Sequence, residues 1–161
     1  MRVATAILAG LACGCQTHQR LVRQDEGVIV NDMRRVIAAE AVYESLNGGF
    51  PDKLECLETP RRCIPGYPED GPSVLEPALA RLAPENGYTR EFHPGPAAPF
   101  IPPTSSPSSL ARWAYTAVPT RDRRSRKAFC VDSTQRICTT VDGSAPPVKD
   151  GQCAMPCERV Q

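Results

Sequence analysis

Apolar residues recur with a helical period in the first third of the chain. Ile29, Met33, Val36 and Tyr43 are spaced so that they share one face of a helix. The charged side chains assigned to the opposite, solvent-facing side are Asp32, Arg34, Arg35, Glu40 and Glu44. The pattern predicts a long amphipathic helix from about residue 20 to residue 46. It is expected to end at Asn47-Gly48-Gly49, because Asn and Gly adopt the left-handed backbone that closes a helix.

After residue 86 the pattern changes to extended runs rich in β-branched and aromatic residues. The predicted strands are 87–92, 112–118, 128–132 and 136–141. Segment 94–109 holds six prolines and four serines and is predicted to be an exposed loop with polyproline character. A capping box from Ser73 to Glu76 predicts a second helix over 77–82. The predicted fold class is α+β, with the long N-terminal helix packed on a three- to four-stranded antiparallel sheet.

Composition narrows the possible functions. The chain has 161 residues, 41% of them hydrophobic, which suits one domain with a modest core. A formal net charge of +1 argues against a globally basic nucleic-acid-binding domain, so nucleic acid is not an expected partner. His18 and His93 are the two histidines, too few for a His-centred metal site or most catalytic triads. No enzyme activity, metal, cofactor or small-molecule substrate is predicted.

The N-terminus has the pattern of an export signal. Arg2 precedes an apolar run over 3–12, about half the ~20 residues that span a bilayer. A cysteine directly after such a run resembles a bacterial lipoprotein signal, in which the cysteine is acylated and begins the mature chain. Cys15 is favoured over Cys13 because small residues precede it and because its use leaves an even number of cysteines.

This pattern predicts a signal peptide over residues 1–14 and a lipidated Cys15, with Cys13 as the alternative site. Residues 15–27 are polar and predict a stalk, in which Gly27 weakens the helix. Gln16 after the lipidated cysteine favours the outer membrane. Secretion without acylation stays open, because it removes the same two cysteines.

The remaining cysteines predict disulfides: Cys56, Cys63, Cys130, Cys138, Cys153 and Cys157. In an exported chain an even count favours bridges over a thiolate zinc cluster. Spacing does not determine the pairing. We expect Cys56 to pair with Cys63 and the four late cysteines to pair among themselves, which would tether a tail over residues 142–161.

A basic run between two predicted strands is the sharpest local charge feature. Its cations are Arg121, Arg123, Arg124, Arg126 and Lys127. Such a run is suited to contact with anionic lipid head groups, lipopolysaccharide or DNA. The alternative is a solvated loop whose charge is balanced by acids elsewhere.

Several local sequences resemble the globular domain of type IV pilins and of the pseudopilins of type II secretion. The matching positions are Tyr43, Asn47-Gly48-Gly49-Phe50-Pro51 and Leu54 at the helix exit, then 113–119 and 129–132 in the sheet. The resemblance covers about residues 28–141 and implies a pilin-like domain. It departs from the family at 16–27, which is polar where family members carry the apolar segment that builds a filament core.

The resemblance and the export signal together lead us to expect a non-catalytic, lipid-anchored component of the cell envelope, associated with a pilus or secretion system. Its expected partners are a membrane, through the lipid anchor, and proteins of that apparatus. The alternative is a secreted or periplasmic binding module that is stabilised by disulfides and carries no anchor.

Overall fold

The computed structural model of the chain describes residues 9–120 and 126–160, with side chains described from residue 19 onward. The helical elements are α1 (Ala9–Asn47), α2 (Glu55–Glu58), the 3-10 helix η1 (Pro60–Arg62) and α3 (Pro77–Ala80). The strands are β1 (Tyr88–Pro94), β2 (Trp113–Pro119), β3 (Ala128–Asp132), β4 (Ile137–Thr140), β5 (Val148–Lys149), β6 (Gln152–Cys153) and β7 (Glu158–Arg159). The predicted α+β class is confirmed.

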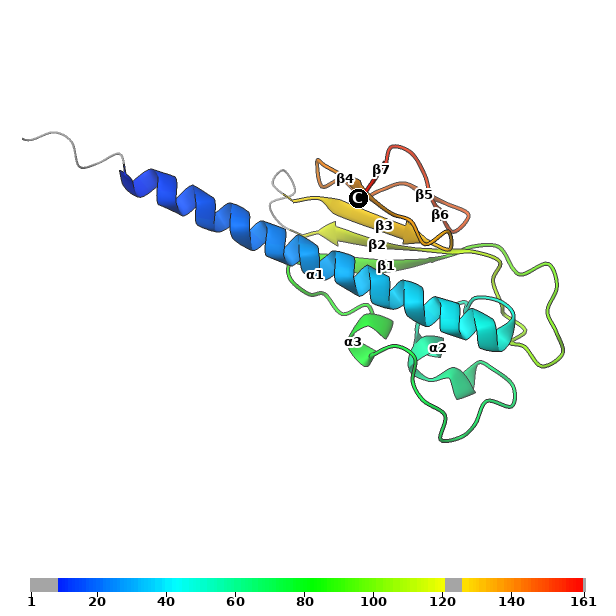
Figure 1. Cartoon of the computed structure of the whole chain (residues 1–161). Coiled ribbons are helices and arrows are strands. Elements are labelled where there is room, and N and C mark those ends of the chain that lie inside the picture. Colours follow the sequence, from blue (N-terminus) through cyan, green and yellow to red (C-terminus); the bar gives the residue numbers. More distant parts are fainter. Residues whose placement is uncertain (1–8, 121–125, 161) are drawn as a thin grey trace, which may run out of the picture.

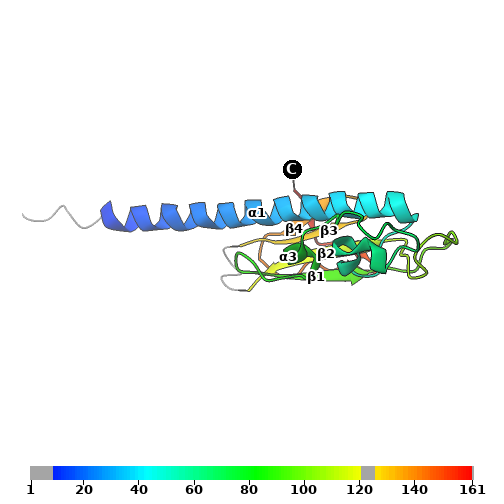
Figure 2. The same ribbon diagram turned by 90° about the horizontal axis from the view of Figure 1, so that it is seen from below.

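Helix α1 and the main sheet form two layers (Figures 1 and 2). The C-terminal part of α1 crosses one face of the sheet, and its N-terminal part projects beyond it. The predicted apolar stripe faces the core, since Ile29, Met33, Val36 and Tyr43 are all buried. The helix is longer than predicted and continues through Gly27 and the polar segment 15–27. It ends as predicted at Asn47, because Gly48 adopts a φ of 74°.

The main sheet differs from the prediction in its number of strands. Within the described residues it has five antiparallel strands in the order β1-β2-β3-β4-β7, not three or four. The additional strand, β7, comes from the C-terminal tail and pairs Glu158 with Thr139 of β4. A strand of two residues has no periodic pattern by which to predict it. The tail also forms the separate β5-β6 hairpin.

Aromatic side chains of β2 fill the space between the sheet and α1. Trp113 and Tyr115 lie on the same face of the strand and are both buried. Trp113 stacks on Phe92 of β1, with ring centroids 6.4 Å apart, and meets the edge of Phe50 at 6.3 Å. These contacts join the helix exit to the first two strands.

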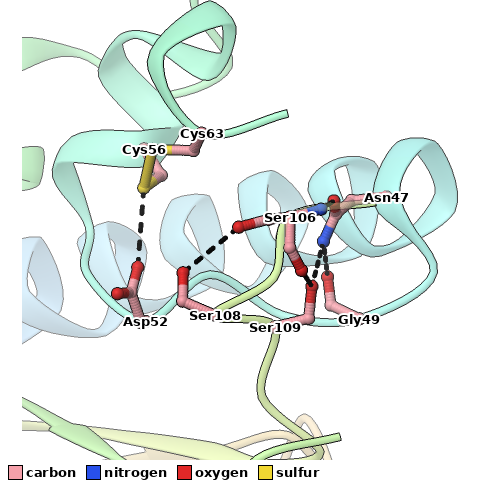
Figure 3. The surroundings of a disulfide bond; sticks show 8 residues. All are labelled: Asn47, Gly49, Asp52, Cys56, Cys63, Ser106, Ser108 and Ser109. Carbon is pink, nitrogen blue, oxygen red and sulfur yellow. Dashed lines mark hydrogen bonds between the residues drawn. A yellow bond between two sulfur atoms is a disulfide. The ribbon is translucent and has the colours of Figure 1, made fainter. Parts of the chain in front are cut away.

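The proline-rich segment 94–109 is not the fully exposed loop that the sequence predicts. Ser106 and Ser109 are buried against the end of α1. The Asn47 side-chain amide donates to the Gly49 carbonyl (3.0 Å) and to Ser109 Oγ (2.8 Å), and its oxygen accepts from the Ser106 backbone N–H (2.7 Å) (Figure 3). The loop therefore caps the helix exit, beside the Cys56–Cys63 disulfide.

The predicted capping box before α3 is wrong. Glu76 itself occupies the N-cap position and makes no side-chain cap hydrogen bond. Its carboxylate instead pairs with Arg35 of α1. Ser73 Oγ donates to the Leu75 carbonyl at 2.8 Å. Pro77 at the first helical position starts the helix, which is shorter than predicted.

Candidate functional site

Three disulfides join the six cysteines whose side chains the structure describes. Cys56–Cys63 closes the α2-η1 segment. Cys130–Cys153 ties β3 to β6, and Cys138–Cys157 ties β4 to the residue before β7. The four late cysteines thus fasten the tail onto the sheet. Disulfides persist in oxidising compartments, which indicates an extracellular or periplasmic location.

The proposed lipidation site lies outside the described side chains. The backbone of Cys13 and Cys15 forms part of α1, and the structure describes nothing further of these residues. Among the described residues, no helix combines the length and the apolar character needed to cross a membrane.

The described part of the basic run serves to hold the fold together. Arg126 pairs with Asp25 of α1 (Nη2 to Oδ2, 3.0 Å) and donates to the Asn86 carbonyl at 2.9 Å. Its guanidinium also lies 5.9 Å from the centre of the Tyr88 ring. The Lys127 backbone N–H donates to the Glu26 carboxylate, 2.9 Å away. Arg126 is therefore engaged within the protein rather than offered to an anion.

The other three predicted anion contacts, Arg121, Arg123 and Arg124, lie outside the described residues. The structure therefore brings two of the five cations, Arg126 and Lys127, to the side of α1.

A buried ion pair fastens α1 to β1. The Arg90 side chain is fully buried and pairs with Asp32 of α1. Arg90 also donates to Glu85 (3.1 Å) and to the Ala83 carbonyl (3.0 Å). Burial raises the pKa of Asp32 above its ordinary value, although the Arg90 charge opposes this shift. The prediction that Asp32 faces solvent is wrong, since it is 6% exposed.

Glu40 is a charged residue of α1 in an apolar setting. The sequence places it on the solvent side of the helix, yet it is 1% exposed. Within the described residues, neither carboxylate oxygen has a hydrogen-bond partner. Burial raises the pKa of Glu40 well above its ordinary value, and the nearby Glu44 charge adds to the shift. Its position could have been found from spacing alone, because it lies four residues after Val36 and three before Tyr43.

The described side chains form no cluster suited to a metal ion. In residues 9–120 and 126–160 no cluster of three His, Cys, Asp or Glu side chains could hold a metal ion. The His93 ring nitrogen Nε2 lies 2.9 Å from Thr116 Oγ1, and burial lowers the pKa of His93. His18 has no described side chain.

No known family model, curated protein or solved structure matches the chain. The evidence for the candidate sites therefore comes from contacts within this chain.

Proposed function

We propose that the protein is a non-catalytic component of the bacterial cell envelope, in which a lipid on Cys15 anchors a disulfide-stabilised, pilin-like head. The observation that carries this proposal is the shape of α1. The helix leaves the head at its N-terminal end and continues, without a break, toward the cysteine that follows the apolar run (Figure 1).

The exposed part of α1 suits a stalk between a membrane and the head. Most described residues from 19 to 28 are exposed, with Val22 as a buried exception, and the regularly spaced buried positions of α1 begin at Ile29. At 1.5 Å per residue, the helix between Cys15 and Ile29 is about 20 Å long. Because this part of α1 is rich in polar residues, it is more stable in water than in the interior of a membrane. A lipid on Cys15 supplies the apolar anchor that the stalk itself lacks.

The head has the features expected of a structural or interaction module outside the cytoplasm. Its sheet is tied by two disulfides, and α1 is joined to it by a buried ion pair. The likeness to pilins and pseudopilins lies in this arrangement of a long N-terminal helix on an antiparallel sheet. We therefore propose a pilus or secretion system as the associated apparatus.

Acylation is tested by expressing the full chain in a Gram-negative host with radiolabelled palmitate. The wild type is expected to carry the label and to partition into detergent. Cys15→Ala is expected to lose both properties, and Cys13→Ala is the matched control that keeps them. Labelled, detergent-partitioning Cys15→Ala protein would overturn the proposal.

The disulfides and the polar stalk also suit a second candidate, a secreted or periplasmic binding module with no lipid. Mass spectrometry of the mature N-terminus distinguishes the lipid-anchored protein from the unanchored module. An unmodified N-terminus downstream of Cys15 supports the unanchored module.

A further inference from the structure

The outer side of α1 carries an apolar stripe. Among the described residues, seven large apolar side chains are exposed, and four of them belong to this helix: Leu21, Val28, Val42 and Leu46, each between 40% and 54% exposed. The first three are separated by multiples of seven residues, and Leu46 lies one turn after Val42, so all four fall on one side of the helix. Since α1 runs along the outside of the head and continues beyond it (Figure 2), this side is accessible to a partner.

One charged residue interrupts the stripe. Arg35 lies seven residues after Val28 and seven before Val42. Its guanidinium is paired within the chain, to Glu76 and to Asp32 (Nη1 to Oδ1, 3.7 Å). These carboxylates offset its charge, so two copies of Arg35 can approach each other. A polar residue at such a position also favours one register between two helices over the others.

The two flanks of the stripe carry opposite charges. Arg20 and Arg34 directly precede stripe positions and lie, exposed, on one flank. Asp25 and Asp32 come four residues after stripe positions and lie on the other flank. In two parallel helices the first flank of one meets the second flank of the other, so Arg20 lies beside Asp25 of the second copy. In antiparallel helices like flanks meet and repel, so the charges favour the parallel arrangement.

We propose that this stripe is an interface between two copies of the chain, in which the α1 helices pair in parallel and in register. Leu21, Val28 and Val42 of one copy lie beside the same residues of the other. Asp25 is 29% exposed even though it pairs with Arg126 of its own chain, so it remains accessible to Arg20 of the second copy. The parallel direction places both N-termini at the same end, as two lipid anchors in one membrane require. The pairing itself does not depend on the proposed function.

The interface is narrow. The positions three residues after those spaced by seven are small or polar: Gln24, Asn31, Ala38 and Ser45. Four half-exposed apolar side chains bury far less than the roughly 800 Å² that each partner contributes to a stable interface. The dimer is therefore weak in solution. A shared membrane anchor strengthens it, because it raises the effective concentration of one copy near another.

The test is disulfide cross-linking of the purified full chain with its three disulfides formed. Cys13 and Cys15 are replaced by Ser, so that no acyl group contributes and a failure of the lipid anchor does not affect the result. The remaining six cysteines are engaged in the disulfides. One new cysteine is introduced at a time, and the dimers formed on mild oxidation are measured on a non-reducing gel at increasing protein concentration.

Leu21→Cys, Val28→Cys and Val42→Cys are each expected to form cross-linked dimers, because parallel helices in register bring each position next to its own copy. Arg23→Cys is the matched control, since it is exposed and two residues from Leu21 but lies on another side of α1. It is expected to cross-link about tenfold less. Adding Val28→Gln and Val42→Gln to Leu21→Cys removes apolar contact without changing charge, and is expected to reduce its dimers about tenfold.

Four results would each overturn the proposal. The first is the absence of dimers from every stripe variant at the highest concentration. The second is equal cross-linking of Arg23→Cys and the stripe variants, and the third is an unchanged yield of dimers after the two Gln substitutions. The fourth is a mixture in which Leu21→Cys links to Val42→Cys while neither links to itself, which is the pattern of antiparallel helices. If the Gln variant does not fold, the single-cysteine comparison decides.

Discussion

Replacing Glu40 with Gln should stabilise the protein at neutral pH and change how its stability depends on pH. Glu40 is buried in the middle of the α1 stripe, and its carboxylate has no hydrogen-bond partner among the described residues. The folded state therefore disfavours the ionised form, which raises the pKa of Glu40 well above that in the unfolded chain. Gln has nearly the same shape and cannot ionise.

The change of the free energy of unfolding with pH depends on how many protons the folded and unfolded states bind. With a raised pKa, the folded state holds the Glu40 proton at pH values where the unfolded state has released it. The contribution of Glu40 to stability is therefore most favourable below the ordinary glutamate pKa of 4.5. It falls by about 1.4 kcal/mol for each pH unit above that value, until the folded-state pKa is passed.

Glu40→Gln removes this loss, so its advantage over the wild type grows with pH across the same window. Glu40→Met also removes the unpartnered polar atoms, which adds about 1–3 kcal/mol at every pH. Glu55→Gln, at an exposed position of α2, is the matched control and should change the profile little.

The assay is urea unfolding of each variant from about pH 4 to about pH 8, with the free energy of unfolding compared at each pH. Comparison with the wild type isolates Glu40 from Asp32, whose pKa is also raised by burial. A Glu40→Gln variant whose free energy of unfolding parallels that of the wild type at every pH would show that burial of Glu40 does not shift its pKa.

Three further predictions concern the contacts that hold the head together, each measured by urea unfolding near neutral pH. Asp32→Ala leaves the buried Arg90 charge without its α1 partner and should cost about 3–5 kcal/mol, whereas removing an exposed pair through Arg81→Ala should cost about 1 kcal/mol or less; equal losses would contradict the burial argument. Replacing both Cys138 and Cys157 by Ser should cost about 2–4 kcal/mol and expose the β4 amides to hydrogen exchange; unchanged exchange would show that β7 stays paired without the bridge. Asn47→Ala leaves the groups around the helix exit unpaired and should cost about 1–3 kcal/mol, and no loss would show that the 94–109 loop does not depend on it.

The α1 stripe and the four long strands could be predicted because their patterns are local. Ile29, Met33 and Val36 repeat at helical spacing, and 113–119 and 128–132 are rich in residues that favour strands. The end of α1 at Asn47-Gly48 could be predicted for the same reason, because it depends on the residues at that position. Strand β7 is two residues long and has no such pattern, and the adjacent bridge between Cys138 and Cys157 is not determined by spacing alone.

The errors at Asp32 and Glu40 have a different origin. Residue type alone predicts both on the solvent side, although Glu40 lies at a core position of the helical period. Asp32 is covered by Arg90 of β1, a residue 58 positions away that no local pattern connects with it.

We propose that a lipid on Cys15 anchors this head to a membrane. Mass spectrometry of the N-terminal peptide of the mature protein, purified from the membrane fraction of a Gram-negative host, tests this anchor. The expected peptide begins at Cys15 and carries the added mass of its acyl groups. A mature peptide that begins elsewhere, or begins at Cys15 with no added mass, would contradict it.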